Sequence, residues 1–319
     1  MSREKLATRI RCPACASSGL KNIYTVRFTQ EPIKSFLQSF YEPQGKVEFE
    51  YLADSSFALD ECLSCGLIFQ KNIPDAELSK RLYTQWIDPE NDIKTMENNT
   101  AEIYAALARE IMLLLGCFSR PPAGIKFLDF GMGWGRAAIM ARAFGCEAYG
   151  VELSERKAGY ARGFGIKTIS EGEIRGNRFD IINVGEVLEH LPEPLETLKT
   201  LKSALDPGGV MRITVPDGSD IKRRLKTGDW RAPKGSRNSL NAVSPLEHIN
   251  CFTHASLLKM AGLAGLRRKK MPLGVQYRYM TGWRPFKQVL KNLLGPVYNN
   301  FVKKGTFLYF SVDIRRGVV

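Results

Sequence analysis

The chain has no apolar run that approaches the roughly 20 residues a membrane-spanning helix needs. The first five residues, Met1 to Lys5, also contain no apolar signal core, so we do not expect export. With 319 residues, 44% hydrophobic and 25% charged, the composition is that of an ordinary globular protein with room for two domains. We therefore expect a cytoplasmic protein with no transmembrane segment.

Acidic residues are scarce in the C-terminal part of the chain. After Glu247 the only acid is Asp313, and the chain carries a net charge of +13. Its basic residues gather in two stretches, residues 222–237 and 267–304. A field of this sign attracts an anion such as a sugar nucleotide, a phosphorylated glycan, nucleic acid or an acidic membrane surface. The alternative is a solvated basic surface without a partner.

One short segment indicates a nucleoside ligand. An apolar run ends in Asp129, and Gly131, Gly133 and Gly135 follow at every second position before a helical pattern begins. This layout predicts a strand, a tight turn and a helix N-terminus. Neither the G-x-G-x-x-G pattern nor a P-loop fits, because the third glycine comes one residue early and no Gly-Lys-Ser/Thr follows. The next apolar run ends in Glu152, whose carboxylate could accept hydrogen bonds from both ribose hydroxyls. Taken alone, Asp129 or Glu152 could equally cap a helix.

Two C-x-x-C pairs, Cys12 with Cys15 and Cys62 with Cys65, supply four thiolates for a tetrahedral zinc ion. A redox dithiol and disulfides are alternatives, but a cytosolic setting disfavours disulfides. The gap between the pairs, about residues 16–61, must then carry its own strands or a small subdomain. The single cysteines at 117, 146 and 251 are interpreted as small buried hydrophobic residues.

Residues 122–265 resemble the class I S-adenosylmethionine-dependent methyltransferases. The resemblance rests on the glycine loop Leu128–Gly135, on Glu152, and on the segments 170–174, 179–191 and 205–211. It implies a Rossmann-like α/β fold, a seven-stranded methyltransferase sheet, with a small N-terminal zinc-binding subdomain. It also implies S-adenosylmethionine as cofactor, with Glu171 an alternative to Glu173 at the adenine amine. The implied cofactor-binding residues are Asp129, Gly131, Gly133, Gly135, Glu152, Glu173, Gly185, Glu186 and His190.

The cysteine pairs and the segment after them resemble the N-terminal zinc-ribbon segment of methyltransferases that act on sugars and natural products. In nucleotide-sugar members a Glu-His pair lies in the acceptor pocket, and Glu247-His248 matches it here. Those enzymes usually carry a tyrosine where this chain has Pro245, which puts carbon methylation in doubt. We expect His248, oriented by Glu247, to be the catalytic base, or else a hydrogen-bonded anchor for its loop. His190 could instead cap a helix, and His254 is expected near a helix N-cap.

The predicted organisation is a zinc-ribbon segment with a helical linker over residues 1–95 and a methyltransferase domain over residues 96–319. The latter includes a basic substrate loop, 217–250, and a basic C-terminal region, 266–319. Within that region we predict an amphipathic helix pair over 281–302, interrupted at Gly295-Pro296, which could cover the active site, dimerise or touch a membrane. A final strand over 306–312 should be the antiparallel strand that ends the sheet.

The predicted function is methylation, on oxygen or carbon, of a small anionic acceptor, most simply a sugar nucleotide or a glycan intermediate of polysaccharide biosynthesis. One rival is an RNA methyltransferase. Nucleic acid is disfavoured because the segment Asn183–Glu186 lacks the prolines and aromatic residue that hold a flipped base. The other rival is a non-catalytic protein that binds S-adenosylmethionine. The sequence does not fix the oligomeric state.

Overall fold

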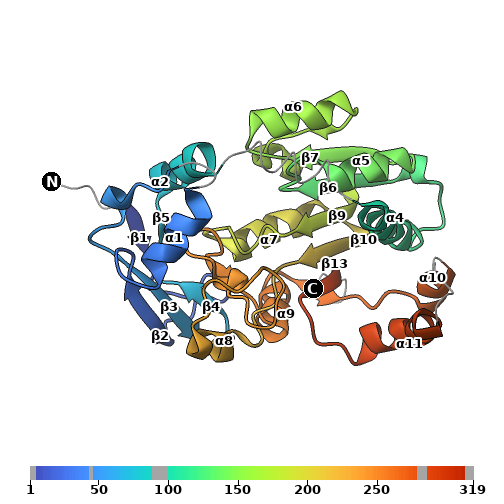
Figure 1. Ribbon diagram of the computed structural model, residues 1–319. Helices are drawn as coiled ribbons and strands as arrows, with labels where there is room; N and C mark the ends of the chain where they lie inside the picture. The colour runs from blue at the N-terminus through green and yellow to red at the C-terminus, as the bar shows by residue number, and fades with distance from the viewer. Residues whose placement is uncertain (1–4, 43–45, 88–99, 279–285, 313–319) are drawn as a thin grey trace. The chain divides into compact units, whose positions relative to one another are not determined.

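The computed structural model describes residues 5–42, 46–87, 100–278 and 286–312 (Figure 1). The chain divides into two units, each of which is treated by itself. Unit 1 comprises Met1–Asn98, Leu188–Leu195 and Val215–Met260, and unit 2 comprises Asn99–Val187, Glu196–Thr214 and Ala261–Val319. The boundary that we predict near residue 95 falls outside the described residues. Residues 188–195 and 215–260, which the sequence reasoning assigns to the methyltransferase domain, belong to unit 1.

Unit 2 is built on one seven-stranded sheet, which confirms the predicted fold class. Its strands are β6 (Lys126–Phe130), β7 (Glu147–Val151), β8 (Lys167–Thr168), β9 (Phe179–Gly185), β10 (Leu205–Thr214), β12 (Leu266–Arg268) and β13 (Phe307–Val312). They lie in the order β12-β13-β10-β9-β6-β7-β8. The five strands from β8 to β10 are parallel, and β13 is antiparallel to both its neighbours. The parallel strands bring their carboxyl ends to one edge, where ligands bind in such sheets.

Helices α4 (Ala101–Leu115) and α5 (Arg136–Ala143) pack against this sheet through apolar residues that recur at helical spacing. The unit also contains α6 (Glu155–Gly163), α10 (Leu273–Arg278) and α11 (Phe286–Phe301), with 3₁₀ turns η3 (Pro122–Gly124) and η4 (Glu171–Gly176), while α7 (Pro194–Ala204) and α9 (His254–Leu263) begin in unit 1 and end in unit 2. Ile111 and Leu114 of α4 and Ala141 of α5 pack with Phe127 and Ile181 in one buried cluster. Residues 111–115 therefore lie in a helix that packs onto the core of the sheet.

Two expectations for the C-terminal region are wrong in detail. The run 306–312 does form antiparallel β13, but β13 lies between β10 and β12, so β12 ends the sheet instead. The three residues of β12 are too few to stand out in the sequence. Helix α11 continues through Gly295-Pro296 as one helix, where a pair of helices was expected. Proline removes one backbone donor, but neighbouring turns can carry the helix past it.

Unit 1 holds two smaller sheets. One pairs β1 (Leu6–Thr8) with β5 (Asn72–Pro74), and the other has the order β11-β4-β3-β2. Its members are β2 (Leu20–Arg27), β3 (Ser56–Cys62), β4 (Ile68–Gln70) and β11 (Asn250–Cys251). The helical segments are α1 (Ile33–Tyr41), η1 (Phe49–Tyr51), α2 (Ala76–Arg81), the π-helical turn η2 (Leu82–Trp86), α8 (Ile221–Thr227) and η5 (Asn241–Val243). The gap between the cysteine pairs thus carries its own strands, as predicted.

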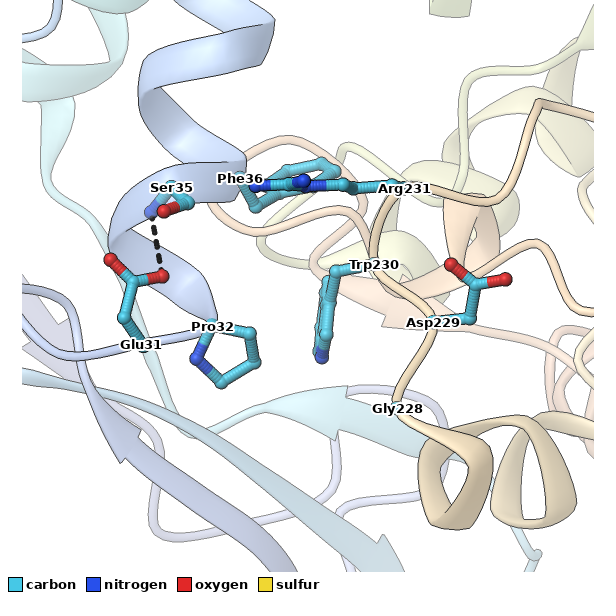
Figure 2. A pocket seen from close by; sticks show the side chains of 8 residues that line it. All are labelled: Glu31, Pro32, Ser35, Phe36, Gly228, Asp229, Trp230 and Arg231. Atoms are coloured by element: carbon cyan, nitrogen blue, oxygen red, sulfur yellow. Dashed lines mark hydrogen bonds between the residues drawn. The ribbon is translucent and has the colours of Figure 1, made fainter.

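The predicted basic substrate loop, 217–250, supplies part of the unit 1 core. Trp230 is buried, and its ring lies 5.5 Å from that of Phe36 and 5.6 Å from that of Phe57, centroid to centroid. Trp230 lines a small pocket of about 190 Å³ together with Glu31, Pro32 and Asp229. Figure 2 shows the Trp230 ring beside Pro32. An indole packed among aromatic rings is a core contact, so this part of the segment is held in place.

Candidate active site

The glycine loop joins β6 to α5 through three residues with positive φ. Gly131, Gly133 and Gly135 have φ values of 65°, 54° and 75°, a conformation that favours glycine. A Cβ on Gly131 would lie 2.6 Å from the side chain of Val187, whereas one on Gly133 would meet no atom within 4 Å. The loop is therefore closed on its inner side and open at Gly133, which suits backbone that must approach a ligand.

Asp129 is buried beneath this loop and holds it in place. Its carboxylate accepts hydrogen bonds from the amide of Ala138, at 3.2 Å, and from the side chain of Asn183, at 2.7 Å. Burial raises the pKa of Asp129 to about 6, and the Asn183 and Ala138 hydrogen bonds and the charge of Arg212 oppose that rise. An ionised Asp129 thus ties the start of α5 to the neighbouring strand β9.

Sequence reasoning missed a polar chain that extends from Asp129 across the sheet. Asn183 also accepts a hydrogen bond from Arg212 on β10, at 2.7 Å. Arg212 forms an ion pair with Glu110, which in turn accepts a hydrogen bond from the hydroxyl of Tyr309 on β13, at 2.6 Å. The available signal was Asn183 itself, a buried amide in the apolar run Ile181–Val184, because buried polar groups need partners.

Glu152 lies at the end of β7, next to the glycine loop. One carboxylate oxygen accepts the amide hydrogen of Gly133 at 2.9 Å, and the other accepts that of Ser154 at 2.8 Å. A carboxylate offers about four acceptor sites, so two remain for hydroxyl donors. The arrangement fits a ribose. Ribose binding by Glu152 stays a prediction.

The other expected cofactor residues of unit 2 lie at turns. The Glu173 carboxylate accepts hydrogen bonds from the amide and hydroxyl of Ser170, at 2.7 and 2.6 Å, and so caps its own turn. The spacing S-x-x-E was the sequence signal for this cap. Gly185 ends β9, and Glu186 follows with a φ of 56°, a left-handed conformation that non-glycine residues adopt mainly where structure holds them. The assignment of these residues to the cofactor stays a prediction.

Four cysteines converge in unit 1. The Sγ atoms of Cys12 and Cys65 lie 3.5 Å apart, as do those of Cys15 and Cys62, and all four lie within 4.8 Å of one another. Zinc–sulfur bonds of about 2.3 Å at tetrahedral angles place sulfurs about 3.8 Å apart. The four thiols therefore have the spacing that one zinc ion requires.

Two histidines meet elsewhere in unit 1. The rings of His190 and His248 are 4.8 Å apart, edge to face. His190 Nδ1 lies 3.0 Å from the carbonyl oxygen of Glu247 and 3.3 Å from the hydroxyl of Tyr83, and His248 Nδ1 contacts the carbonyl oxygen of Asn241. A carbonyl only accepts, so each Nδ1 carries the proton and each Nε2 is left as an acceptor. The Glu247 carboxylate accepts the hydroxyl proton of Tyr41 at 2.9 Å.

The environment keeps both imidazoles neutral near pH 7. Burial, followed by the charges of His190 and Lys234, lowers the pKa of His248 to about 3, against the hydrogen bond to Asn241. Burial and the charge of Lys234 lower the pKa of His190 to about 4, while the hydrogen bond to the Glu247 carbonyl opposes this. A neutral His248 offers Nε2 as an acceptor, but an imidazolium pKa of about 3 makes it a weak base at pH 7. The structure thus places His190 with Glu247 and His248; its assignment to the cofactor stays a prediction.

Three buried or half-buried polar residues that sequence reasoning missed hold these histidines in place. The amide of Gln70 donates to the carbonyls of Ser244 and His248, at 2.8 and 3.1 Å, and its oxygen accepts the amide hydrogen of Leu246. Asn250 donates to the carbonyl oxygens of the 188–191 segment, and Arg9 donates to Asn250 and to the Pro192 carbonyl oxygen. These are positioning residues, and the fully buried Gln70 in an apolar strand was their clearest signal.

A second metal-ligand set overlaps this cluster. Glu189 is buried, and its carboxylate lies 3.8 Å from His190 Nε2. Ligand atoms of Glu189, His190 and His248 all lie within 4.8 Å of one another. Two imidazoles and a carboxylate could hold a divalent cation, but in that case His248 Nε2 would bind the metal and would not take a proton.

The basic segment after β10 is largely occupied with its own backbone. Arg223 donates to the carbonyl oxygen of Arg237 at 3.1 Å, and Arg224 donates to that of Ser239 at 3.1 Å. Lys222 pairs with Glu61. Lys234 is exposed, and its charge lowers the pKa of both histidines, so it could meet an anion near them.

Comparison with known proteins gives one family and several relatives. Residues 100–268 match the family described as Methyltransferase domain. The chain is 25% identical over 226 residues to the ubiquinone biosynthesis O-methyltransferase of Idiomarina loihiensis, which covers 62% of this chain and 85% of that protein. It is also 25% identical over 224 residues to the protein of that name from Ruegeria pomeroyi, with coverages of 62% and 85%.

Among solved structures, the chain is similar to the plantazolicin methyltransferase BamL, solved with a desmethylPZN analogue and SAH. That likeness has a TM-score of 0.47 at 15% identity and covers 73% of this chain and 92% of the other.

Proposed function

The chain belongs to the family of S-adenosylmethionine-dependent methyltransferases, and we propose that it methylates a hydroxyl of a small anionic acceptor, a sugar nucleotide or a glycan intermediate. The observation that carries the proposal is the pair of neutral imidazoles, His190 and His248, held at Nδ1 by backbone carbonyls, with the Tyr83 hydroxyl and the Glu189 carboxylate 3.3 and 3.8 Å from His190. Such a set of donors and acceptors suits an acceptor rich in hydroxyl groups.

S-adenosylmethionine supplies a methyl group bound to a positively charged sulfur. A hydroxyl oxygen can attack this methyl group once the hydroxyl proton is removed. The glycine loop, Asp129 and Glu152 would hold this cofactor through backbone amides and carboxylates. His248 Nε2 takes the proton of the acceptor hydroxyl, because Nδ1 is already bonded to the Asn241 carbonyl. Tyr41 holds the carboxylate of Glu247, while the Asn241 carbonyl holds the ring of His248.

Oxygen is favoured over carbon as the methylated atom. The relatives from Idiomarina loihiensis and Ruegeria pomeroyi are named O-methyltransferases. In addition, Pro245 replaces the tyrosine usual in the sugar C-methyltransferases. The anionic class of the acceptor is supported by Lys234, whose charge acts on both histidines.

The test compares His248→Gln and His248→Ala with His254→Gln, a control at the chain's third histidine. Purified protein is incubated with labelled S-adenosylmethionine, a panel of sugar nucleotides, their dephosphorylated sugars and simple phenols, and the product is mapped by mass spectrometry and NMR. We expect kcat to fall by about 100-fold or more in both His248 variants, with SAH affinity unchanged. Turnover by His248→Gln within twofold of the wild type would exclude the base role.

Two further readouts separate the parts of the proposal. Lys234→Ala should raise KM for the sugar nucleotide but not for the dephosphorylated sugar. Methylation of phenols alone would overturn the acceptor class and leave the base role intact. A divalent metal whose removal abolishes activity, and whose binding is lost with His248, would make His248 a ligand instead of a base.

We also propose that Cys12, Cys15, Cys62 and Cys65 bind a structural zinc ion. The support is their mutual spacing and the complete set of four thiols, which leaves no open coordination position for catalysis.

A further inference from the structure

Helix α11 of unit 2 has its apolar face turned outward. Leu290, Leu293, Leu294, Val297 and Phe301 follow helical spacing and form one stripe, the α11 stripe. All five are exposed, from 44% at Val297 to 60% at Phe301. Tyr298 and Val302, also more than half exposed, extend it at its C-terminal end. A contiguous apolar surface of this kind marks an interaction site in a protein that is otherwise charged.

The opposite face of α11 is polar, and this is the face that packs on the unit. Asn292 and Asn300 are buried, and the Asn300 amide donates to the Met271 carbonyl oxygen at 2.8 Å. Tyr277 of α10 donates its hydroxyl proton to the Leu293 carbonyl oxygen at 2.7 Å. Asn299, Lys291 and Lys303 line a cavity of about 350 Å³ beneath the helix. Polar contacts therefore fix the helix with its apolar stripe away from the core.

Cations border the α11 stripe. Lys270 Nζ lies 4.0 Å from the centre of the Phe301 ring, and Lys291, which stands at the edge between the stripe and the cavity, and Lys304 are exposed. Residues 248–312 contain neither aspartate nor glutamate. A second copy docked by a two-fold axis would place these lysines against the same lysines, because such an interface uses one patch twice. An anionic surface, by contrast, meets both the apolar stripe and its basic border favourably.

We propose that α11 binds the surface of a membrane that contains anionic phospholipid, lying in the plane of the interface with its stripe among the acyl chains. Among residues 5–42, 46–87, 100–278 and 286–312, no helix is long and apolar enough to cross a bilayer. The 16 residues of α11 extend about 24 Å, and one face is polar, so the helix fits along the interface. Lys270 and Lys291 meet the phosphate groups at its edges.

The test is vesicle sedimentation of the full-length protein. Vesicles of phosphatidylcholine alone are compared with vesicles of phosphatidylcholine and phosphatidylglycerol at 7:3, at low and at 0.5 M salt. Leu294→Ser with Phe301→Ser removes two exposed apolar side chains without touching the buried face, and Ile103→Ser, at an exposed apolar residue of α4, is the matched control. Lys270→Gln with Lys291→Gln tests the basic border.

We expect binding to the anionic vesicles that exceeds binding to phosphatidylcholine at least about tenfold and weakens in high salt. The double serine variant should bind about 100-fold more weakly, since each buried Leu or Phe contributes a factor of about ten or more. The lysine variant should lose the preference for anionic vesicles, and Ile103→Ser should bind like the wild type.

Three outcomes overturn the proposal: no binding to either vesicle, unchanged binding of the serine variant, or dimers in light scattering that the serine substitutions dissociate. The last would assign the α11 stripe to a second copy. Binding is measured without acceptor or cofactor, so the result does not depend on the proposed function.

Discussion

The amide of Asn183 is the point at which a single substitution should change the electrostatics of the glycine loop. It donates to Asp129 at 2.7 Å and accepts from Arg212 at 2.7 Å. Asn183→Ala removes both hydrogen bonds and leaves two buried charged groups with fewer partners. Hydrogen bonds to charged groups are worth about 1.5–3 kcal/mol each, so the free energy of unfolding should fall by about 3–6 kcal/mol.

The same change should raise the pKa of Asp129 further. With a pKa of about 6, Asp129 is ionised in about nine of ten wild-type molecules at pH 7. Loss of a hydrogen bond worth about 1.5 kcal/mol to the ionised form moves the midpoint by about one unit, to near neutral pH. Half of the variant molecules would then carry a protonated Asp129 at pH 7, which weakens the anchor of the α5 amide at Ala138.

The measurement is a carboxyl ¹³C NMR titration of Asp129 together with calorimetric SAH binding from pH 5.5 to 8. We expect the titration midpoint to move upward in Asn183→Ala, and SAH affinity in the variant to decline already between pH 8 and 6.5. Asn22→Ala is the matched control, because Asn22 donates to buried Asp60 at 3.0 Å in unit 1. An Asp129 that titrates in Asn183→Ala at or below its wild-type midpoint would refute the reasoning.

The remaining predictions concern unit 1. Cys15→Ser should reduce zinc in the purified protein from about one ion per chain towards none, measured by plasma mass spectrometry, and should lower the melting temperature; equal zinc in both proteins would contradict the site. For His248, a folded pKa of about 3 against an ordinary 6.5 means that the unfolded chain binds the proton first as pH falls. Its contribution to stability is therefore complete above pH 6.5 and is lost towards pH 3. By pH 4.5 the loss amounts to about 2–3 kcal/mol of unfolding free energy. His248→Gln should flatten this acid limb in urea unfolding, and a limb as steep as that of the wild type would show that His248 is not its source.

Local geometry made part of the site predictable. Gly131, Gly133 and Gly135 have a left-handed backbone conformation, and their residue type and spacing predict it directly. The cysteine pairs were equally readable, because two C-x-x-C motifs have few uses other than metal binding, and the structure brings their sulfurs together. The alternation of apolar runs and helical patterns was enough to predict the parallel sheet.

Partners distant in sequence were not predictable from local patterns. Asn183 and Gln70 each stand in an apolar strand, and the sequence shows that they need partners but not which ones. His190 and His248 lie 58 positions apart, so nothing local shows that their rings meet. Likewise, helical spacing identified the apolar stripe of α11, but spacing alone does not say which face of a helix turns inward.

Unit 1 is assembled from three separate segments of the chain, so its core cannot form until the last of them has been synthesised. Strand β11 pairs Asn250 with Phe69 of β4, and the unit 1 core needs Trp230 and Val243 as well as Phe57. Because the ribosome releases these segments far apart in time, the cysteine-bearing strands emerge long before the residues that complete their core. Zinc held by Cys12, Cys15, Cys62 and Cys65 would stabilise the early strands through that interval, since all four are in place once residue 65 is made. For the same reason residues 1–98 cannot be excised as a module: cutting the chain there separates Phe57 from Trp230 and leaves both halves of one core exposed.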